Sequence, residues 1–312
     1  MHSPHPIHHI TAIAADPREC VDFYTRVLGL RLVKKTVNQD QTEAYHLFFG
    51  DRTGEPGMDL TFFTFPGVGA GQRGRGTVST IALAVPASAL PFWQARFEQL
   101  GVEQEGVATS FDQQVLTFYD GDGQRLQLVG VNEAELDSQA VWTTDEVGQA
   151  QAVRCFYGAR LAVAATNLVE PILTEVLGFE WQVEQDGVRS YRISGERRAG
   201  VLEIEEVVEQ SPPTYNGAGT VHHIAFQVKD RAELLRTREQ VRALGLYPTE
   251  VIDRYYFQSV YFRTPAGILF ELATNGPGFT ADEDEATLGQ KLALPPFLEP
   301  QRAEIESRLM PL

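Results

Sequence analysis

Apolar and polar positions along this 312-residue chain follow one pattern four times. In each copy an apolar run, typical of a buried strand, precedes an amphipathic helical segment, and short alternating segments such as YHLFFG and SVYFRT follow. A Leu-Gly pair ends each helical segment, at Leu28-Gly29, Leu100-Gly101, Leu177-Gly178 and Leu244-Gly245. Because glycine tolerates the positive φ of a helix C-cap, these pairs predict four helix ends. The pattern predicts an α+β fold of four βαβββ modules with strongly curved antiparallel sheets.

The four modules form two related halves. The segment GTVSTIALAV, which begins at Gly76, aligns with GTVHHIAFQV, which begins at Gly219. Residues 132–150 between the halves are polar and acidic without an apolar period, as expected of a linker. We therefore predict modules one and two in residues 1–140, modules three and four in residues 150–280, and a helical tail over residues 281–312.

Adjacent histidines open an apolar strand at two matching points of the repeat. They are His8-His9 in PIHHITAIAADP and His222-His223 in GTVHHIAFQVKD, and Glu271 interrupts the apolar run GILFELAT in the last strand of module four. Two imidazoles and one carboxylate on one face can hold a divalent metal and leave other coordination positions open. The pattern therefore predicts a metal site rather than packing alone.

Only one histidine of each pair should face the cavity, because adjacent strand residues point to opposite faces. The spacing to Asp16 and Asp230, each seven residues further on, selects His9 and His223 as ligands together with Glu271. Modules two and three carry residues that cannot make a divalent site at the matching positions, namely Thr80, Gln127 and Arg160, with Glu203 and Ile204 on either side of the last position of module three. The last strand of module one has Thr61 where module four has Glu271. One metal centre per chain is expected.

Several neighbours of this triad are candidates for catalysis. His8 and His222 could orient the ligands or move protons, although structural packing also explains them. Thr11 shares the parity of His9 and could line the cavity, but threonine is common in strands for its β-propensity alone. Arg254 and Tyr261 precede Glu271 on neighbouring strands and could steady a phenolate, or could instead form an ion pair with Asp253 and a core contact.

Composition excludes some partners. The formal charge of −16 argues against nucleic acid and anionic membranes, which bind clustered Lys and Arg. Cys20 and Cys155 are too few and too far apart for a disulfide framework, which suits a reducing compartment. The N-terminus lacks a signal-peptide pattern, and no apolar run reaches the ~20 residues of a membrane span. We expect a cytoplasmic protein; a homo-oligomer is allowed but not specified.

Nitrogen and oxygen ligands in this combination suit Fe(II), with Mn(II) as the main rival. Zinc prefers closed or sulfur-richer sites. The segment GAGQRGRG at Gly69 lacks the Lys-Ser/Thr of a phosphate loop and is better interpreted as the connection between modules one and two.

Taken together, the motifs FYTRVLGLRLVKKTVN, LTFFTFPG, HHIAFQVKDR, VIDRYYFQSVYFRTPAGILFELAT and GPGFTADE resemble ring-cleaving dioxygenases of the vicinal oxygen chelate (glyoxalase/bleomycin-resistance/dioxygenase) superfamily. The similarity extends over nearly the whole chain and is greatest to hydroquinone and chlorohydroquinone 1,2-dioxygenases.

The resemblance implies two barrels of paired modules, with Fe(II) held by His9, His223 and Glu271 between modules one and four. It also implies pocket roles for His8, Thr11, His222, Arg254 and Tyr261, with a small aromatic substrate and O₂ as reactants and an open-chain acid as product. In more typical two-domain relatives both histidines lie in the C-terminal half, but this chain has Arg160 in module three, so modules two and three should build a metal-free barrel.

Two other functions remain open at this stage. A lyase or isomerase that resembles glyoxalase I would need a fourth protein ligand, and Thr61 at the matching position argues against it, although Asp59 has the same parity. A protein that sequesters an aromatic compound or a drug, as bleomycin-resistance relatives do, would not need the triad. Within the dioxygenase interpretation, the sequence does not distinguish hydroquinones from catechols.

Overall fold

The computed structural model describes residues 4–136, 141–208 and 210–312. Module one contains β1 (Ile7–Ile13), α1 (Pro17–Asp22), a π-helical turn (Phe23–Val27), β2 (Arg31–Val37), β3 (Tyr45–Gly50) and β4 (Asp59–Thr64). Module two contains β5 (Thr77–Pro86), a 3₁₀ turn (Ala87–Ala89), α2 (Leu90–Leu100), β6 (Gln104–Ser110), β7 (Gln113–Tyr119) and β8 (Arg125–Val131).

The C-terminal half repeats this order of elements. Module three contains β9 (Cys155–Val163), a 3₁₀ turn (Thr166–Leu168), a π-helical turn (Ile172–Val176), β10 (Glu180–Gln185), β11 (Val188–Arg192) and β12 (Val201–Glu206). Module four contains β13 (Thr220–Val228), α3 (Arg231–Ala243), β14 (Ile252–Asp253), β15 (Gln258–Arg263) and β16 (Leu269–Thr274). The tail contains 3₁₀ turns (Phe279–Ala281, Glu285–Thr287 and Glu299–Gln301) and α4 (Arg302–Arg308).

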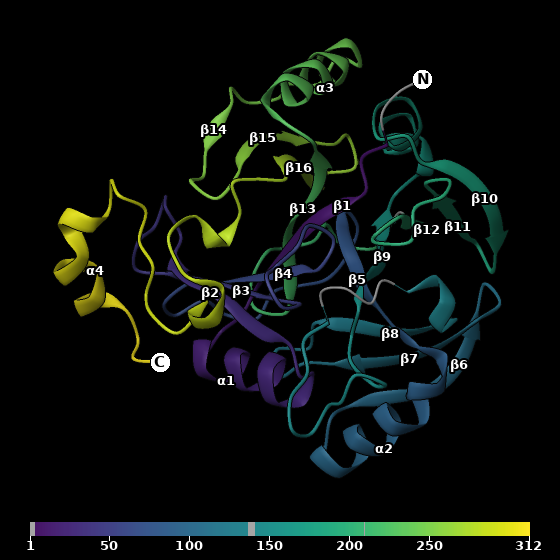
Figure 1. The fold of residues 1–312 in the computed structure, drawn as a ribbon. Helices are drawn as coiled ribbons and strands as arrows, with labels where there is room; N and C mark the ends of the chain where they lie inside the picture. Colours follow the sequence, from purple (N-terminus) through teal and green to yellow (C-terminus); the bar gives the residue numbers. More distant parts are fainter. Residues whose placement is uncertain (1–3, 137–140, 209) are drawn as a thin grey trace.

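The strands form two eight-stranded sheets that lie beside each other (Figure 1). The first combines modules one and four in the order β14-β15-β16-β13-β1-β4-β3-β2, and the second combines modules three and two in the order β10-β11-β12-β9-β5-β8-β7-β6. The predicted α+β fold of four βαβββ modules is confirmed. The predicted boundary at residue 140 lies outside the described residues, and the division into sequence halves stays a prediction.

The sheets, predicted to be antiparallel, are mixed and contain parallel as well as antiparallel pairs. In each module the last strand lies beside the first and parallel to it, as in β1 with β4 and β13 with β16. Alternating apolar residues predict a strand but do not tell which neighbour it will pair with. The two modules of each sheet meet in an antiparallel pair, β1 with β13 and β5 with β9.

The four Leu-Gly pairs end the helical segments as predicted, since Gly29, Gly101, Gly178 and Gly245 all have φ between 67° and 79°. Module three differs from the other modules in its helical segment. This segment consists of separate 3₁₀ and π-helical turns, and Pro171, which lacks an N–H donor, lies between them.

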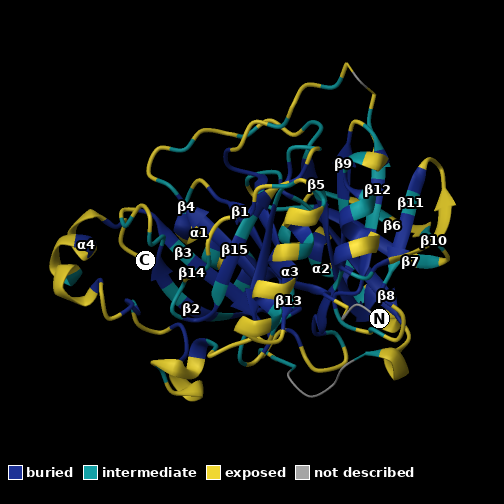
Figure 2. Ribbon diagram, turned by 90° about the horizontal axis from the view of Figure 1, so that it is seen from above, coloured by how far each residue is buried: buried dark blue, intermediate teal, exposed yellow. Residues whose placement is uncertain are grey.

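One large hydrophobic cluster runs through both sheets and packs against the helices. Figure 2 shows the sheets as largely buried, with exposed outer faces on α3 and α4. A second, smaller cluster includes Val33, Phe48, Tyr256, Phe257 and Phe279, and it joins the tail to module four. In the part of the chain that the structure describes, no helix has the length and apolar character needed to span a bilayer.

A buried ionic contact connects the tail to module one. Lys34 on β2 is fully buried, and its Nζ lies 2.7 Å from Asp282 Oδ1 and close to Glu283 Oε2. The Tyr256 hydroxyl donates to Asp282 Oδ2 at 2.9 Å, and the Ala293 N–H donates to the Lys35 carbonyl. The tail therefore covers one side of the first sheet and binds to it through charge as well as through apolar contacts.

Replacing Lys34 by Met should lower the free energy of unfolding by about 3–5 kcal/mol, because the two tail carboxylates lose their buried partner. Urea unfolding measures this change. Lys35→Met is the matched control, since the Lys35 side chain is partly exposed, and it should change stability by less than about 0.5 kcal/mol. Equal stability of the two variants would contradict an important role for the ionic contact.

Candidate metal centre

Three side chains from three neighbouring strands converge at the middle of the first sheet. His9 lies on β1, His223 on β13 and Glu271 on β16. His9 Nε2 lies 3.2 Å from His223 Nε2 and 3.2 Å from Glu271 Oε2, and His223 Nε2 lies 3.0 Å from the same oxygen. These are the three ligands that the sequence predicted, and each offers one atom to a common point.

The spacing and chemistry of this group fit a divalent cation. Two donors bonded at about 2.1 Å to one ion, at right angles, are about 3 Å apart, which is the separation observed here. Glu271 is fully buried, and although its Oε1 accepts a hydrogen bond from Ser259 Oγ at 2.5 Å, its Oε2 accepts none of good geometry from the described residues. A buried carboxylate oxygen of this kind, between two imidazole nitrogens, needs a positive partner.

Electrostatics favour the protonation states that bind metals. Burial raises the pKa of the Glu271 carboxyl, but the adjacent His9 and His223 outweigh that effect and hold its pKa well below the usual range. Burial is also the main cause of the lowered pKa of His223, which keeps its imidazole neutral. An ionised carboxylate and a neutral imidazole are the forms with free lone pairs.

Both strands carry a β-bulge at the histidine pair. Ile7 and His9 pair with Phe226 and Ala225, so His8 is an extra residue on β1. Thr11 and Ala12 pair with His223 and Val221, so His222 is an extra residue on β13. A bulge re-aims the side chains around it, which simple alternation did not predict.

The bulges bring the paired imidazoles into contact. His8 Nδ1 lies 3.0 Å from His9 Nδ1, and His222 Nδ1 lies 2.8 Å from His223 Nδ1. Burial, assisted by the adjacent ring, lowers the pKa of His8 and of His222 to about 3 in each case. Both outer histidines are thus placed where they can fix the orientation and tautomer of the inner ones.

The other predicted pocket residues lie around the same point. Thr11 Oγ1 is 2.9 Å from His223 Nε2, and the Tyr261 ring lies edge-on to the His223 ring at 5.9 Å. The Arg254 guanidinium lies 5.5 Å from the centre of the Tyr261 ring and forms an ion pair with Asp40 rather than with Asp253. Burial, followed by the charge of Glu271, raises the pKa of Tyr261, so the phenol keeps its proton.

A cavity opens onto His9 and His223. Its walls are mainly aromatic, and the residues that provide them are Phe48, Phe63, Tyr256, Phe257, Tyr261 and His46. Arg254 and Asp40, which form an ion pair, also line it. Such a space, apolar with a few polar groups, suits a flat aromatic molecule.

Sequence analysis did not identify His46 as a site residue. It lies on β3 between Phe48 and Phe63, with ring centroids 3.9 Å and 4.4 Å from theirs, and its Nε2 is 2.9 Å from Thr61 Oγ1. The sequence did contain a signal for His46. In YHLFFG it lies two residues before Phe48 and therefore on the same face of the strand. It is also a polar residue within an apolar strand, as Glu271 is in GILFELAT.

The second sheet shows that one predicted correspondence was wrong. The sequence repeat matches Arg160 to His9 and Thr80 to His223. In the structure Arg160 pairs with Thr80, whereas Thr11 is the residue that pairs with His223. Arg160 therefore corresponds to Thr11. The error of two residues arose because module three has no histidine to mark the position, and the apolar pattern repeats every two residues.

The true counterpart of His9 in module three is Gly158, which pairs with Ala82. A Cβ at Gly158 would lie 2.1 Å from the Val201 carbonyl oxygen, so no side chain fits there. Glu203 corresponds to Glu271 but forms an ion pair with Arg160, at 2.7 Å between Oε2 and Nε. The second sheet thus lacks the donor set of the first.

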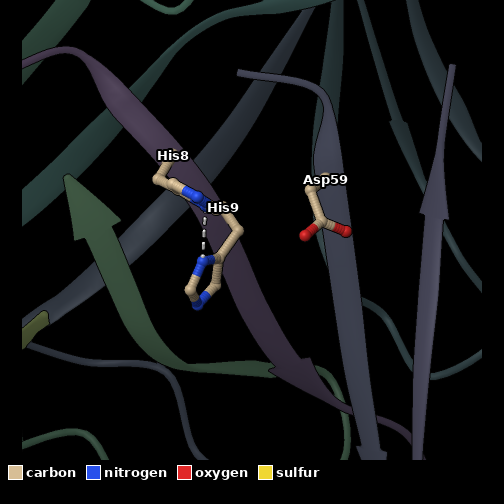
Figure 3. A group of neighbouring side chains, drawn as sticks. All are labelled: His8, His9 and Asp59. Carbon is tan, nitrogen blue, oxygen red and sulfur yellow. Dashed lines mark hydrogen bonds between the residues drawn. The ribbon is translucent and has the colours of Figure 1, made fainter. Parts of the chain in front are cut away.

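Asp59 is the remaining carboxylate near the triad. It is fully buried on β4 beside His9, and Figure 3 shows it on the strand next to the hydrogen-bonded pair His8 and His9. It groups with those two histidines rather than with His223 and Glu271. Burial, with smaller contributions from Asp51 and Glu271, raises its pKa well above the usual range. Asp59 is therefore a poor fourth ligand for the main site.

Known proteins are similar to this chain in sequence and in fold. A family model described as the Glyoxalase/Bleomycin resistance protein/Dioxygenase superfamily matches residues 6–128 and 172–272. The chain is 40% identical over 98% of both chains to MhqA of Bacillus subtilis (strain 168), provisionally described as a ring-cleaving dioxygenase. It is 31% identical to chlorohydroquinone/hydroquinone 1,2-dioxygenase of Sphingobium indicum, over 96% of this chain and 94% of that protein.

Solved structures extend the comparison. The crystal structure of a Bacillus subtilis protein, also provisionally described as a dioxygenase, superimposes with a TM-score of 0.94 at 38% identity, covering 100% of this chain and 98% of that one. Glyoxalase I from Zea mays has a TM-score of 0.64 at 15% identity over 87% of this chain and 92% of its own, which shows a shared fold alone. The chain therefore belongs to the Glyoxalase/Bleomycin resistance protein/Dioxygenase superfamily.

Proposed function

We propose that this protein is an Fe(II)-dependent dioxygenase that cleaves the aromatic ring of a hydroquinone-type phenol with O₂. The observation that carries the proposal is the triangle of His9, His223 and Glu271 donor atoms beneath an aromatic cavity. The similarity to a chlorohydroquinone/hydroquinone 1,2-dioxygenase over nearly the full length supports the choice of substrate class.

His9, His223 and Glu271 would hold the ion, and Mn(II) is the alternative to Fe(II) because both accept this mixed nitrogen and oxygen set. When bound, a redox-active metal would supply the electron transfer that lets O₂ react with the ring. Three protein ligands leave room for other ligands on the cavity side, where the aromatic walls can hold the ring.

The remaining polar residues have distinct tasks in this proposal. Arg254 lies at the cavity wall and would stabilise negative charge on a substrate hydroxyl that loses its proton. Tyr261, which stays protonated, would donate a hydrogen bond into the cavity, and His222, neutral and beside His223, would accept or return the proton. His8 would orient His9 through their Nδ1 contact.

Two other functions fit less well. A lyase similar to glyoxalase I would need a fourth ligand, and the matching position holds Thr61, whose hydroxyl is already bonded to Thr11. A sequestering protein would need the cavity but not a buried carboxylate between two imidazoles.

Metal binding gives the first test. Glu271→Gln should weaken Fe(II) or Mn(II) binding, measured by anaerobic calorimetry, by at least about 100-fold, because a charged ligand is lost. Glu203→Gln is the matched control at the corresponding position of the second sheet, and it should bind metal like the wild-type protein. Unchanged affinity in Glu271→Gln would place the metal elsewhere.

Oxygen consumption gives the second test. Fe(II)-loaded wild-type protein should consume O₂ in equal amount to a hydroquinone, with loss of the aromatic absorbance, and Glu271→Gln should abolish the uptake while Glu203→Gln retains it. Unsubstituted, methyl- and chlorohydroquinone are compared with catechol to rank substrates. Tight metal binding without uptake for any of them would favour the lyase, and absence of metal binding would favour sequestration.

A further inference from the structure

Three hydroxyl and imidazole groups form a continuous hydrogen-bonded chain from the cavity wall to the candidate metal centre. His46 Nε2 lies 2.9 Å from Thr61 Oγ1, Thr61 Oγ1 donates to Thr11 Oγ1 at 2.7 Å, and Thr11 Oγ1 lies 2.9 Å from His223 Nε2. Neighbouring strands hold these groups in register, since Thr61 on β4 pairs with Thr11 on β1. Both threonines are fully buried.

The directions of the hydrogen bonds follow from the number of protons available. Thr61 has one hydroxyl proton and gives it to Thr11, so its oxygen accepts from His46 Nε2–H. Thr11 receives this bond, and its own proton is left to point toward the centre. Burial, with the nearby His9 and His223, lowers the pKa of His46 well below its usual value, in agreement with a neutral ring that carries one proton.

The last acceptor in the chain changes when the centre binds a cation. Without one, the Thr11 hydroxyl can donate to the lone pair of His223 Nε2. A cation at the centre would use that lone pair, and the Thr11 hydroxyl would then be free to donate to an oxygen held beside the ion. Two donors in series behind Thr11 fix its orientation and polarise its O–H bond.

We propose that His46 and Thr61 are positioning residues that act through Thr11, so that Thr11 presents a fixed hydrogen-bond donor to the substrate or dioxygen oxygen that becomes negative during the reaction. This inference rests on the proposed function. The packing of the His46 ring against Phe48 and Phe63 serves the same end, because it leaves the imidazole little freedom to turn away from Thr61.

Thr61→Val removes the middle hydroxyl with little change in volume. It should lower kcat about tenfold and change KM by less than about threefold, because the donor matters more as negative charge develops. His46→Phe, which keeps the aromatic packing, should show the same loss, and the double variant should lose no more than either single one. Thr61→Ser, which keeps the hydroxyl, should restore most of the rate.

Thr64→Val is the matched control on the same strand. Its hydroxyl is also buried but bonds to no described residue, and Thr64 does not line the cavity, so kcat should stay at the wild-type value. Melting temperature and metal content establish that each variant is folded and loaded. A wild-type kcat in Thr61→Val, or losses that multiply in the double variant, would overturn the inference.

A readout on metal-free protein separates this inference from the proposed function. Nitrogen-15 NMR of the histidine rings should show the His46 proton on Nε2 in the wild-type protein, and the Nε2 resonance should shift in Thr61→Val but not in Thr64→Val. A His46 proton on Nδ1 would overturn the chain even if turnover is observed. Absence of oxygen uptake by wild-type protein would instead reject the dioxygenase proposal, while the NMR result still decides the chain.

Discussion

The antiparallel pairing of β1 with β13 is the contact on which the site depends. It joins two strands that are more than 200 residues apart in sequence and brings His9 Nε2 and His223 Nε2 to 3.2 Å from each other. The parallel pairing of β13 with β16 then adds Glu271. A shift of one residue in the register of a strand turns its side chains to the opposite face of the sheet. Such a shift of β1 or β13 would turn its histidine away from the cavity.

Two β-bulges complete this arrangement. In a regular strand His8 and His222 would point to the opposite face, away from their neighbours. The extra residue on each strand lets both members of a pair approach, so that the inner imidazole reaches the centre while the outer one contacts its Nδ1. The two bulges lie at equivalent positions of the sequence repeat, so the same local structure positions both His9 and His223.

The sequence allowed the module order, the helix ends and the three converging residues to be predicted, because each depends on local patterns that recur. Leu-Gly pairs mark helix ends, and histidine pairs mark equivalent strands. The position of Arg160 was predicted wrongly, since alternation repeats every two residues and module three offers no marker. The contact of Arg254 with Asp40 and the contacts of the tail depend on segments far apart in sequence, which no local pattern specifies.

The two sheets solve the same electrostatic problem in different ways. Each has a glutamate at the equivalent place on the last strand of a C-terminal module, Glu203 or Glu271. In the second sheet the Arg160 guanidinium neutralises Glu203 from the neighbouring strand position, which Ala225 occupies beside Glu271 in the first.

In the first sheet, no Arg or Lys of the described segments pairs with Glu271, and its charge faces two imidazoles whose lone pairs are available. The small, neutral Ala225, where the second sheet has Arg160, therefore leaves both the space and the uncompensated charge that a bound cation would require. In the second sheet the glutamate charge is thus neutralised by an arginine of the same sheet, whereas in the first sheet the charge of Glu271 leaves a place for a bound cation.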